Sequence, residues 1–374
     1  MYLTVLKENL IKALITVGRS ISIRPQLPIL SNILLKTEEN RLKISATNLE
    51  LGIIYTIGAK IEKGGEIAVP GKLMIEFINS LQTDKIELKL EDHNLSVKSG
   101  KTQATFTTVS PADFPPFPLV PANKKILPLE KIKGAITRTV FAASTDESRP
   151  VLTGVKTDIS KGTMSLWATD GYRMSMEKAS FPNKEEELHA ILPAQSLMEV
   201  VRIAQEVKAE EVGFSIIENK NQVVFFLPDI LVFTRLIDGE FPNVEKIIPV
   251  GAKTKVVVDR ELLAQSVKTA SLFARGAANI IKIKIEKEGL RISANSPQVG
   301  NDEDFIEAKV DGEETEIAFN YRFLLDLLAN FPDKEIVLET SGSLNPGVFK
   351  PVTTSTSNGG SFLHLIMPVR VQGA

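Results

Sequence analysis

The chain repeats one pattern three times, at a spacing of more than 120 residues. The phrases LKISATNLEL, LWATDGYRMS and LRISANSPQV place Ala46, Ala168 and Ala294 at the same point, with separations of 122 and 126 residues. Each phrase reads as an apolar strand that runs into a polar turn. Because a long fixed-period repeat is the mark of a duplicated unit, we predict three similar domains rather than one core.

A second marker keeps nearly the same register. An apolar strand followed by an amphipathic helix occurs at residues 67–81, 190–204 and 316–331. The apolar stripe of the first of these helices comprises Met74, Phe77, Ile78 and Leu81, at the spacing of a helix with one face on a core. An earlier helix also repeats, near residues 7, 129 and 259. Each domain is therefore expected to carry two helices.

Between the helices lie short segments in which apolar and polar residues alternate, such as KIELKLED from residue 85 and NLSVKSG from residue 94. A period of two is typical of half-buried antiparallel strands. The segment VVFFLPDILVF predicts a hairpin that turns at Pro228 and Asp229. Proline-rich stretches from residues 114 and 241 read as extended connectors, because proline fixes φ and removes a ladder donor. We therefore expect an α+β fold with helices on antiparallel sheets, in domains 1–121, 122–250 and 251–374.

Composition excludes several function classes. Lys and Arg number 44 and Asp and Glu 46, which leaves a net charge of −2 and no global attraction to nucleic acid or to an anionic membrane. Cysteine is absent, so there are no disulfides, thiol nucleophiles or thiolate-bound metals. The amino terminus lacks the pattern of a signal peptide, and no apolar run reaches the length of about 18 residues that a membrane span needs. We expect a cytoplasmic protein.

Catalytic and cofactor motifs are missing. SGKT at residues 99–102 is like the end of a phosphate loop, but Leu95 stands where that loop needs glycine. The three histidines, His93, His189 and His364, fall in different repeats and have no metal-ligand spacing. Asp170 is expected to bond the backbone of its own Thr-Asp-Gly turn rather than to act as an acid. The residues thus favour a binding protein without cofactor or metal, and a hydrolase or transferase that uses Asp170 or His189 is the alternative.

Six phrases give the chain a specific resemblance. They are RPQLPIL from residue 24, SPADFP from 110, RPVLTG from 149, ATDGYR from 168, IDGEFPNVEKIIP from 237 and MPVR from 367. Together, in this order and spacing, they resemble the β subunits of bacterial DNA polymerase III, the sliding clamps. The resemblance covers essentially the whole chain. It implies a non-enzymatic processivity factor that assembles head to tail as a homodimeric ring of six DNA-clamp domains.

The resemblance also implies how such a ring holds duplex DNA. Twelve helices of about 10 Å diameter, side by side, enclose a hole of roughly 28 Å. Encirclement needs no tight phosphate contacts, since each would add to the salt dependence of binding and hinder sliding. Arg24, Lys72 and Arg149 match DNA-contacting positions of the family. Further basic candidates for the inner face are Lys12, Arg138, Arg202 and Arg275.

A partner-binding cleft between the second and third domains is a further implication. It accepts short peptide motifs from the polymerase α subunit, the clamp loader and other polymerases and repair proteins. Carried over by motif, its residues are Leu152, Thr169, Gly171, Tyr172, Arg173, Met174, Pro242, Lys246, Ile247, Leu365, Ile366, Met367, Pro368, Val369 and Arg370. Methionine adapts to several ligand shapes, and a rim of Arg173, Lys246 and Arg370 can orient a carbonyl or a carboxylate.

The family further implies that the end of the first domain meets the third domain of the other subunit. Phe106 on one side, with Leu272 and Phe273 on the other, is expected to form the apolar centre of this dimer interface. Lys98 and Lys101 are expected to face an acidic segment, residues 302–304. Ion pairs at such a rim set register more than affinity.

Overall fold

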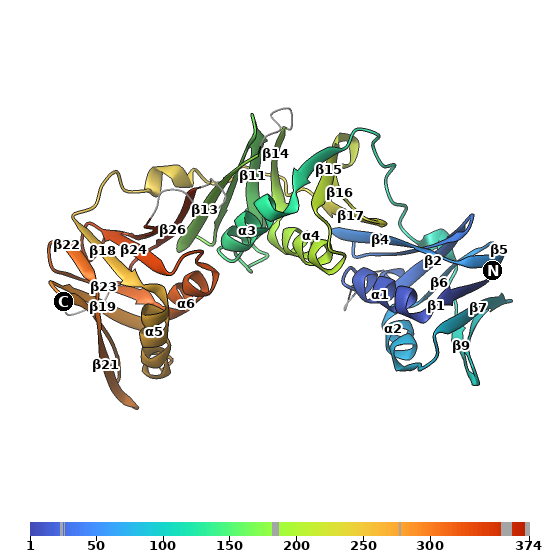
Figure 1. Ribbon diagram of the computed structural model, residues 1–374, viewed down its shortest axis with the longest axis horizontal. Helices are drawn as coiled ribbons and strands as arrows, with labels where there is room; N and C mark the ends of the chain where they lie inside the picture. The colour runs from blue at the N-terminus through green and yellow to red at the C-terminus, as the bar shows by residue number, and fades with distance from the viewer. Residues whose placement is uncertain (23–24, 26, 182–186, 277, 353–360, 371–374) are drawn as a thin grey trace. The chain divides into compact units, whose positions relative to one another are not determined.

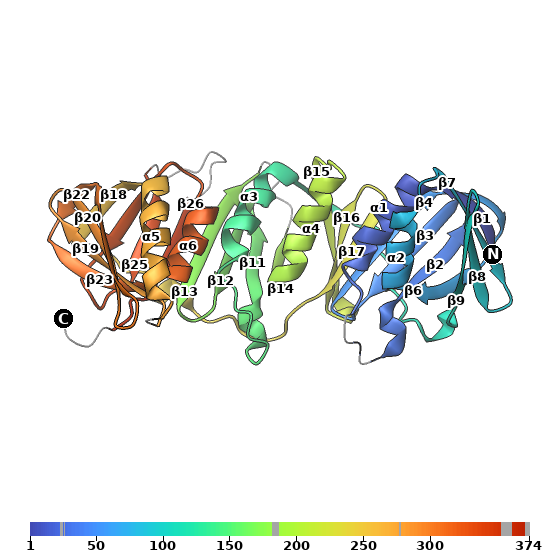
Figure 2. The same ribbon diagram turned by 90° about the horizontal axis from the view of Figure 1, so that it is seen from below.

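The computed structural model describes residues 1–374 except 23–24, 26, 182–186, 277, 353–360 and 371–374. The described residues form two compact units. The first contains residues 1–129 and 199–236, and the second contains residues 130–198 and 237–374. Figures 1 and 2 show helices and antiparallel sheets throughout both units. The predicted α+β class is confirmed, while the predicted boundaries at residues 121 and 250 stay predictions.

Six α-helices are present in the described chain, two in each repeat as predicted. They are α1 (Lys7–Gly18), α2 (Gly71–Ser80), α3 (Leu129–Val140), α4 (Ala194–Glu206), α5 (Arg260–Ala274) and α6 (Tyr321–Asn330). Local capping explains where the last two begin. The side chain of Asp259 accepts hydrogen bonds from the backbone N–H of Glu261 and Leu262, and that of Asn320 accepts one from Arg322. The described residues also form five short 3₁₀ turns, at Pro28–Ser31, Pro111–Asp113, Pro150–Thr153, Glu218–Lys220 and Val244–Ile247.

The first unit contains two antiparallel sheets. In spatial order, the five-stranded sheet comprises β5 (Lys60–Lys63), β1 (Tyr2–Leu6), β7 (Lys85–Glu91), β8 (Asn94–Ser99) and β9 (Thr102–Thr107). The eight-stranded sheet comprises β10 (Lys125–Pro128), β15 (Glu211–Ile217), β16 (Gln222–Leu227), β17 (Ile230–Arg235), β4 (Leu51–Gly58), β3 (Arg41–Thr47), β2 (Asn32–Glu38) and β6 (Glu66–Pro70). The predicted hairpin is the pair β16–β17, joined by Pro228 and Asp229.

The second unit also contains two antiparallel sheets. The nine-stranded sheet comprises β14 (Leu188–Pro193), β11 (Gly154–Ser160), β12 (Thr163–Thr169), β13 (Arg173–Ser180), β26 (Ser361–Ile366), β25 (Gly347–Pro351), β24 (Glu335–Thr340), β18 (Thr254–Asp259) and β22 (Lys309–Gly312). The four-stranded sheet comprises β21 (Gly300–Glu307), β20 (Gly289–Ser296), β19 (Ile280–Glu286) and β23 (Thr315–Asn320).

Strands of neighbouring repeats share a sheet, which the sequence patterns did not predict. In the first unit β17 of the second repeat pairs with β4 of the first, and in the second unit β26 of the third repeat pairs with β13 of the second (Figure 1). We call these pairings the first and the second junction. In both, the last strand of one repeat joins the strand that follows the repeated turn of the preceding one.

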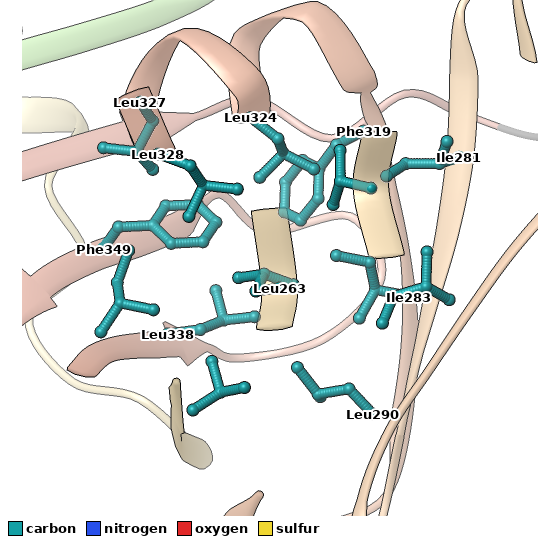
Figure 3. Packing of buried hydrophobic residues seen from close by; sticks show 14 of the residues in the cluster. Leu263, Ile281, Ile283, Leu290, Phe319, Leu324, Leu327, Leu328, Leu338 and Phe349 are labelled. Carbon is teal, nitrogen blue, oxygen red and sulfur yellow. The ribbon is translucent and has the colours of Figure 1, made fainter. Parts of the chain in front are cut away.

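Each repeat buries its helices on its sheets, and the third repeat shows how. Figure 3 shows Leu324, Leu327 and Leu328 on one side of α6, gathered with Phe319 and Phe349 from the strands. The sequence predicted an amphipathic helix within residues 316–331, and these leucines form its apolar face. Within the described residues no helix is both long and apolar enough to cross a membrane, and α5, the longest, has 15 residues.

Candidate functional site

The second junction brings the predicted cleft residues together. Strands β13 and β26 run antiparallel, with Arg173 opposite Ile366, Met174 opposite Leu365 and Ser175 opposite His364. The backbone N–H of Met367 donates to the carbonyl of Tyr172 at 2.8 Å, so the chain after β26 stays beside the repeated turn. Segments far apart in the sequence therefore form one continuous surface.

The turn at Asp170 is held by its own side chains. Oδ1 of Asp170 accepts hydrogen bonds from the backbone N–H of Tyr172 at 2.8 Å and of Arg173 at 3.0 Å. Glycine is needed at position 171, because φ there is +94°, which other residues rarely adopt. The prediction that Asp170 bonds its own turn is confirmed, and with Oδ2 held by Nε of Arg173 the carboxylate is occupied.

The predicted cleft residues divide into a surface set and a supporting set. The surface set comprises Gly171, Tyr172, Pro242, Lys246, Ile247, Met367 and Arg370, with Tyr172 62% and Met367 38% exposed. Partly exposed residues are Leu152, Pro368 and Val369. Buried beneath them lie Thr169, Arg173, Met174, Leu365 and Ile366. The buried residues shape the surface from below and offer a partner little side-chain area.

The proline-containing connector that begins at residue 241 packs against the second junction. Phe241, Val244 and Ile248 of this segment pack on an apolar cluster that includes Trp167 and Met174. Between the connector and the sheet lies a cavity of about 220 Å³, lined by Lys156, Trp167, Phe241, Pro242, Asn243, Val244 and Glu245. Of the predicted cleft residues Pro242 lines this cavity, whereas the exposed apolar side chains of Tyr172, Ile247 and Met367 are not in its lining.

Beneath the surface lies a buried polar network. Arg138 of α3 donates two hydrogen bonds to Glu177, from Nε at 2.9 Å and from Nη2 at 2.5 Å. The hydroxyl of Ser175 donates to the carbonyl of Arg138 at 2.7 Å and lies 3.2 Å from Nδ1 of His364. Burial raises the pKa of Glu177, and Arg138 acts in the opposite direction. Arg138, a candidate for the inner face, is instead an internal ion-pair partner.

His364 is wholly enclosed. Its ring stacks on Phe141 with centroids 5.2 Å apart, and Nε2 has no hydrogen-bond partner within the described chain. Burial, and secondarily the charge of Arg173, holds the pKa of His364 well below its usual range. The imidazole therefore stays neutral at pH 7.

The first junction offers an internal comparison, because its backbone is built in the same way. Oδ1 of Asn48 accepts from the N–H groups of Glu50 and Leu51, as Asp170 does from Tyr172 and Arg173. The N–H of Arg235 donates to the carbonyl of Glu50 at 2.9 Å, as Met367 does to Tyr172. By strand register Leu51 corresponds to Arg173, and Val232, opposite Ile53, corresponds to His364.

The side chains of the first junction make a different surface. Gly52 stands where the second junction has Met174, and the ring of Phe117 fills the space. A β-carbon at position 52 would lie 2.7 Å from that ring, which also packs on Phe233 at 5.3 Å between centroids. The cavity left there measures about 70 Å³. A connector thus packs on each junction, and at the first junction Phe117 fills the space beside Gly52.

The predicted DNA-contacting residues differ in where they lie. Arg24 lies outside the described residues. Lys72 is exposed in the first turn of α2, and Arg149 is exposed and 3.5 Å from Asp146. Arg149 also lies beside the turn of the second junction, since a β-carbon on Gly171 would be 3.6 Å from its Nη1. Within the described chain Lys12 pairs with Glu8 and Arg202 with Glu199.

Of the predicted dimer residues, two are available to a partner. Leu272 of α5 is 57% exposed and Phe273 is partly exposed. Phe106 is only 4% exposed, because its ring packs edge-on against Phe77 at 5.5 Å. Phe106 can therefore contribute little side-chain area to an interface.

Sequence reasoning missed the residues that support the site. Asp326 of α6 forms an ion pair with Arg173 at 2.6 Å, and Phe323 lies under the same guanidinium. The signal available was an acidic residue within an otherwise apolar helix, YRFLLDLLAN. Among the described residues no cluster of three or more metal-ligating side chains occurs.

Comparison with known proteins gives consistent matches along the chain. The family models for the N-terminal, central and C-terminal domains of the DNA polymerase III beta subunit match residues 1–118, 126–243 and 245–370. The beta sliding clamp of Bacillus subtilis is 29% identical, covering 99% of this chain and 100% of its own length, and that of Pseudomonas putida is 28% identical with the same coverage.

Solved structures agree. The DNA polymerase sliding clamp of Bacillus subtilis superposes with a TM-score of 0.92 at 28% identity, covering 99% of both chains. The DNA polymerase III beta subunit of Thermotoga maritima superposes with a TM-score of 0.91 at 27% identity, also covering 99% of both chains.

One prediction concerns the pH dependence of stability. His364→Val places at the second junction the residue that the first junction has at this position. In the wild type, the free energy of unfolding should fall as the pH drops below about 6.5, because the unfolded chain takes up a proton that folded His364 refuses. Urea unfolding at pH 7, 6 and 5 gives the free energy of unfolding at each pH. Its change with pH should be smaller in the variant than in the wild type, by up to about 1.4 kcal/mol per pH unit.

The control is His93→Val, at an exposed histidine of the first unit. It should keep the wild-type slope, since its side chain stays in water in both states. Equal slopes for wild type and His364→Val would show that the buried imidazole does not govern acid stability.

Proposed function

The chain belongs to the DNA polymerase III beta subunit family, the beta sliding clamps, which are non-catalytic processivity factors, and on this premise we propose that it works as a head-to-tail homodimer closed around duplex DNA. Its partners are then double-stranded DNA, held without sequence preference, and the replicative polymerase. No role remains for Asp170 or His189 in a hydrolase or transferase.

The observation that supports the dimer is the strand pairing seen at both junctions, in which the last strand of one repeat pairs with the strand after the repeated turn of another. Strands β9, β17 and β26 each end a repeat, and β4, β13 and β21 each follow the repeated turn. β17 has β4 and β26 has β13, but β9 and β21 lie at sheet edges in the described structure. An unpaired edge is a template for another strand. Pairing β9 of one subunit with β21 of the other gives every repeat this strand pairing.

Such a contact is heterologous, because different surfaces meet. Heterologous contacts close into rings when the rotation allows it and otherwise run on as filaments. In a closed dimer the edges of β9 and β21 are both paired, since each subunit supplies one of each. The six repeats of the two subunits are then joined by six junctions with the same strand pairing. Two of these junctions lie between subunits.

Charge supports the same pairing. The edge strand β21 carries Asp302, Glu303 and Asp304, whereas Lys98 and Lys101 flank β9. Partial burial, with the negative charge of Asp304, raises the pKa of Asp302. Lysines of a second subunit would relieve this repulsion and set the register of the two edges.

The second junction is proposed as the cleft for partner peptides, from the polymerase α subunit, the clamp loader and other replication and repair proteins. Exposed Tyr172, Ile247 and Met367 supply apolar contact, and Lys246 and Arg370 supply charge at its rim. Lys72 and Arg149, with Arg24 outside the described residues, are proposed to face the DNA.

The dimer is tested at Leu272. Leu272→Asp places a charge in the proposed apolar centre, which should weaken the dimer at least tenfold, since an unpaired charge resists burial. Light scattering across a dilution series should show a mass near 41.0 kDa, where the wild type keeps twice that value. Leu262→Asp, at a 50% exposed leucine of the same helix, is the matched control. If Leu272→Asp stays dimeric like its control, the interface lies elsewhere.

The cleft is tested at Met367. Met367→Ala removes exposed apolar surface and should weaken binding of a polymerase-tail peptide about tenfold in calorimetry, with the dimer mass unchanged. Arg235→Ala alters the residue at the same strand position of the first junction and should leave peptide affinity as in the wild type. Equal affinity for wild type and Met367→Ala would remove the peptide site from the second junction.

A further inference from the structure

Arg173 is bound on every side by its own chain. Its guanidinium donates from Nε to Oδ2 of Asp170 at 3.0 Å, from Nη1 to Oδ2 of Asp326 at 2.6 Å and from Nη2 to the carbonyl of Phe141 at 2.9 Å. These partners come from the turn before β13, from α6 and from the end of α3. The side chain thus connects the second repeat to the third, and the residue is only 9% exposed.

Aromatic rings cover the faces of the same guanidinium. Its centre lies 4.7 Å from the ring centroid of Phe323 and 5.7 Å from that of Phe141. Cation–π contact of this kind strengthens where water is excluded. The Phe323 ring in turn stacks with Tyr172, with centroids 6.5 Å apart. The exposed ring of Tyr172 is therefore supported by Phe323, which in turn packs on the guanidinium of Arg173.

The first junction forms the same turn and the same strand pairing without an arginine at this position. Leu51 occupies the corresponding position, yet the turn makes the same side-chain hydrogen bonds and the strands pair in the same register. Strand pairing and turn formation therefore do not require the arginine. What the arginine adds at the second junction is a fixed position of the turn relative to α6.

We propose that Arg173 is a positioning residue for peptide binding, which acts through its ion pair with Asp326 and not by touching the peptide. This inference rests on the proposed cleft at the second junction. Asp326 holds the guanidinium, which holds the turn and Phe323, and these fix Tyr172 beside Met367. The apolar wall of the cleft is thereby preorganised, and the peptide does not lose affinity to the ordering of that wall.

The test begins at Asp326, which lies outside the predicted cleft and whose side chain is half exposed. Asp326→Asn removes the charge with little change of shape and should weaken the polymerase-tail peptide about tenfold in calorimetry. The dimer mass should stay as in the wild type. The melting temperature should fall only slightly, because the half-exposed carboxylate of Asp326 is screened by water and Asp170 still balances the buried guanidinium. Asp333→Asn, just beyond the same helix, should keep wild-type affinity.

A double-mutant cycle tests whether Asp326 acts through Arg173. Arg173→Leu copies the first junction and should also weaken the peptide, and Asp326→Asn in that background should cause no further loss. Two results would overturn the proposal. One is wild-type peptide affinity in Asp326→Asn. The other is that Asp326→Asn weakens the peptide as much in the Arg173→Leu background as in the wild type. Since Asp326 is half exposed, the single variant remains informative even if Arg173→Leu does not fold.

The two proposals fail in different ways. If Met367→Ala binds the peptide as the wild type does, the cleft itself is misplaced. If Met367→Ala weakens the peptide while Asp326→Asn does not, the cleft stands and only the positioning role of Arg173 is rejected.

Discussion

The structure depends on one backbone interaction, the antiparallel pairing of the last strand of a repeat with the strand after the repeated turn of its predecessor. It occurs between β17 and β4 and again between β26 and β13, in matching register. Because strand edges are hydrogen-bonding templates, this pairing joins neighbouring repeats through backbone hydrogen bonds. Two strands lack this partner within the described chain: β9, the last strand of the first repeat, and β21, the strand after the turn of the third. These unpaired edges are the physical reason to expect a second subunit.

The two junctions share a backbone and differ in chemistry, and this difference is the basis on which we propose the second as the peptide cleft. The first junction has Leu51, Ile53 and Val232 where the second has Arg173, Ser175 and His364. Phe117 of the connector covers the first, over a glycine. The second places a charged, hydrogen-bonded layer beneath exposed Tyr172 and Met367. Arg173 and Ser175 of this layer have hydrogen-bond partners, and buried polar groups bonded in this way specify one arrangement, which suits a surface that must present a fixed shape.

Much of this was readable in the sequence, because periodicity and repetition report local structure directly. The six helices, the hairpin at Pro228 and the structural role of Asp170 followed from spacing and turn chemistry. The pairing of β17 with β4 did not, since strand partners from different repeats leave no local pattern. The burial of Arg173 and Phe106 was missed for a related reason: charge and hydrophobicity do not say which partners, such as Asp326 or Phe77, the fold brings near.

The central claim, that edge pairing closes the chain into a ring around DNA, is tested most directly by a topological measurement. The protein is loaded on nicked circular DNA with a clamp loader and ATP, and the retained amount is measured before and after a restriction enzyme linearises the DNA. Encirclement predicts full retention on the circle and loss from the linear form, since a ring slides off a free end. Equal retention on both forms would contradict the ring and point to direct contacts with the DNA as the basis of binding.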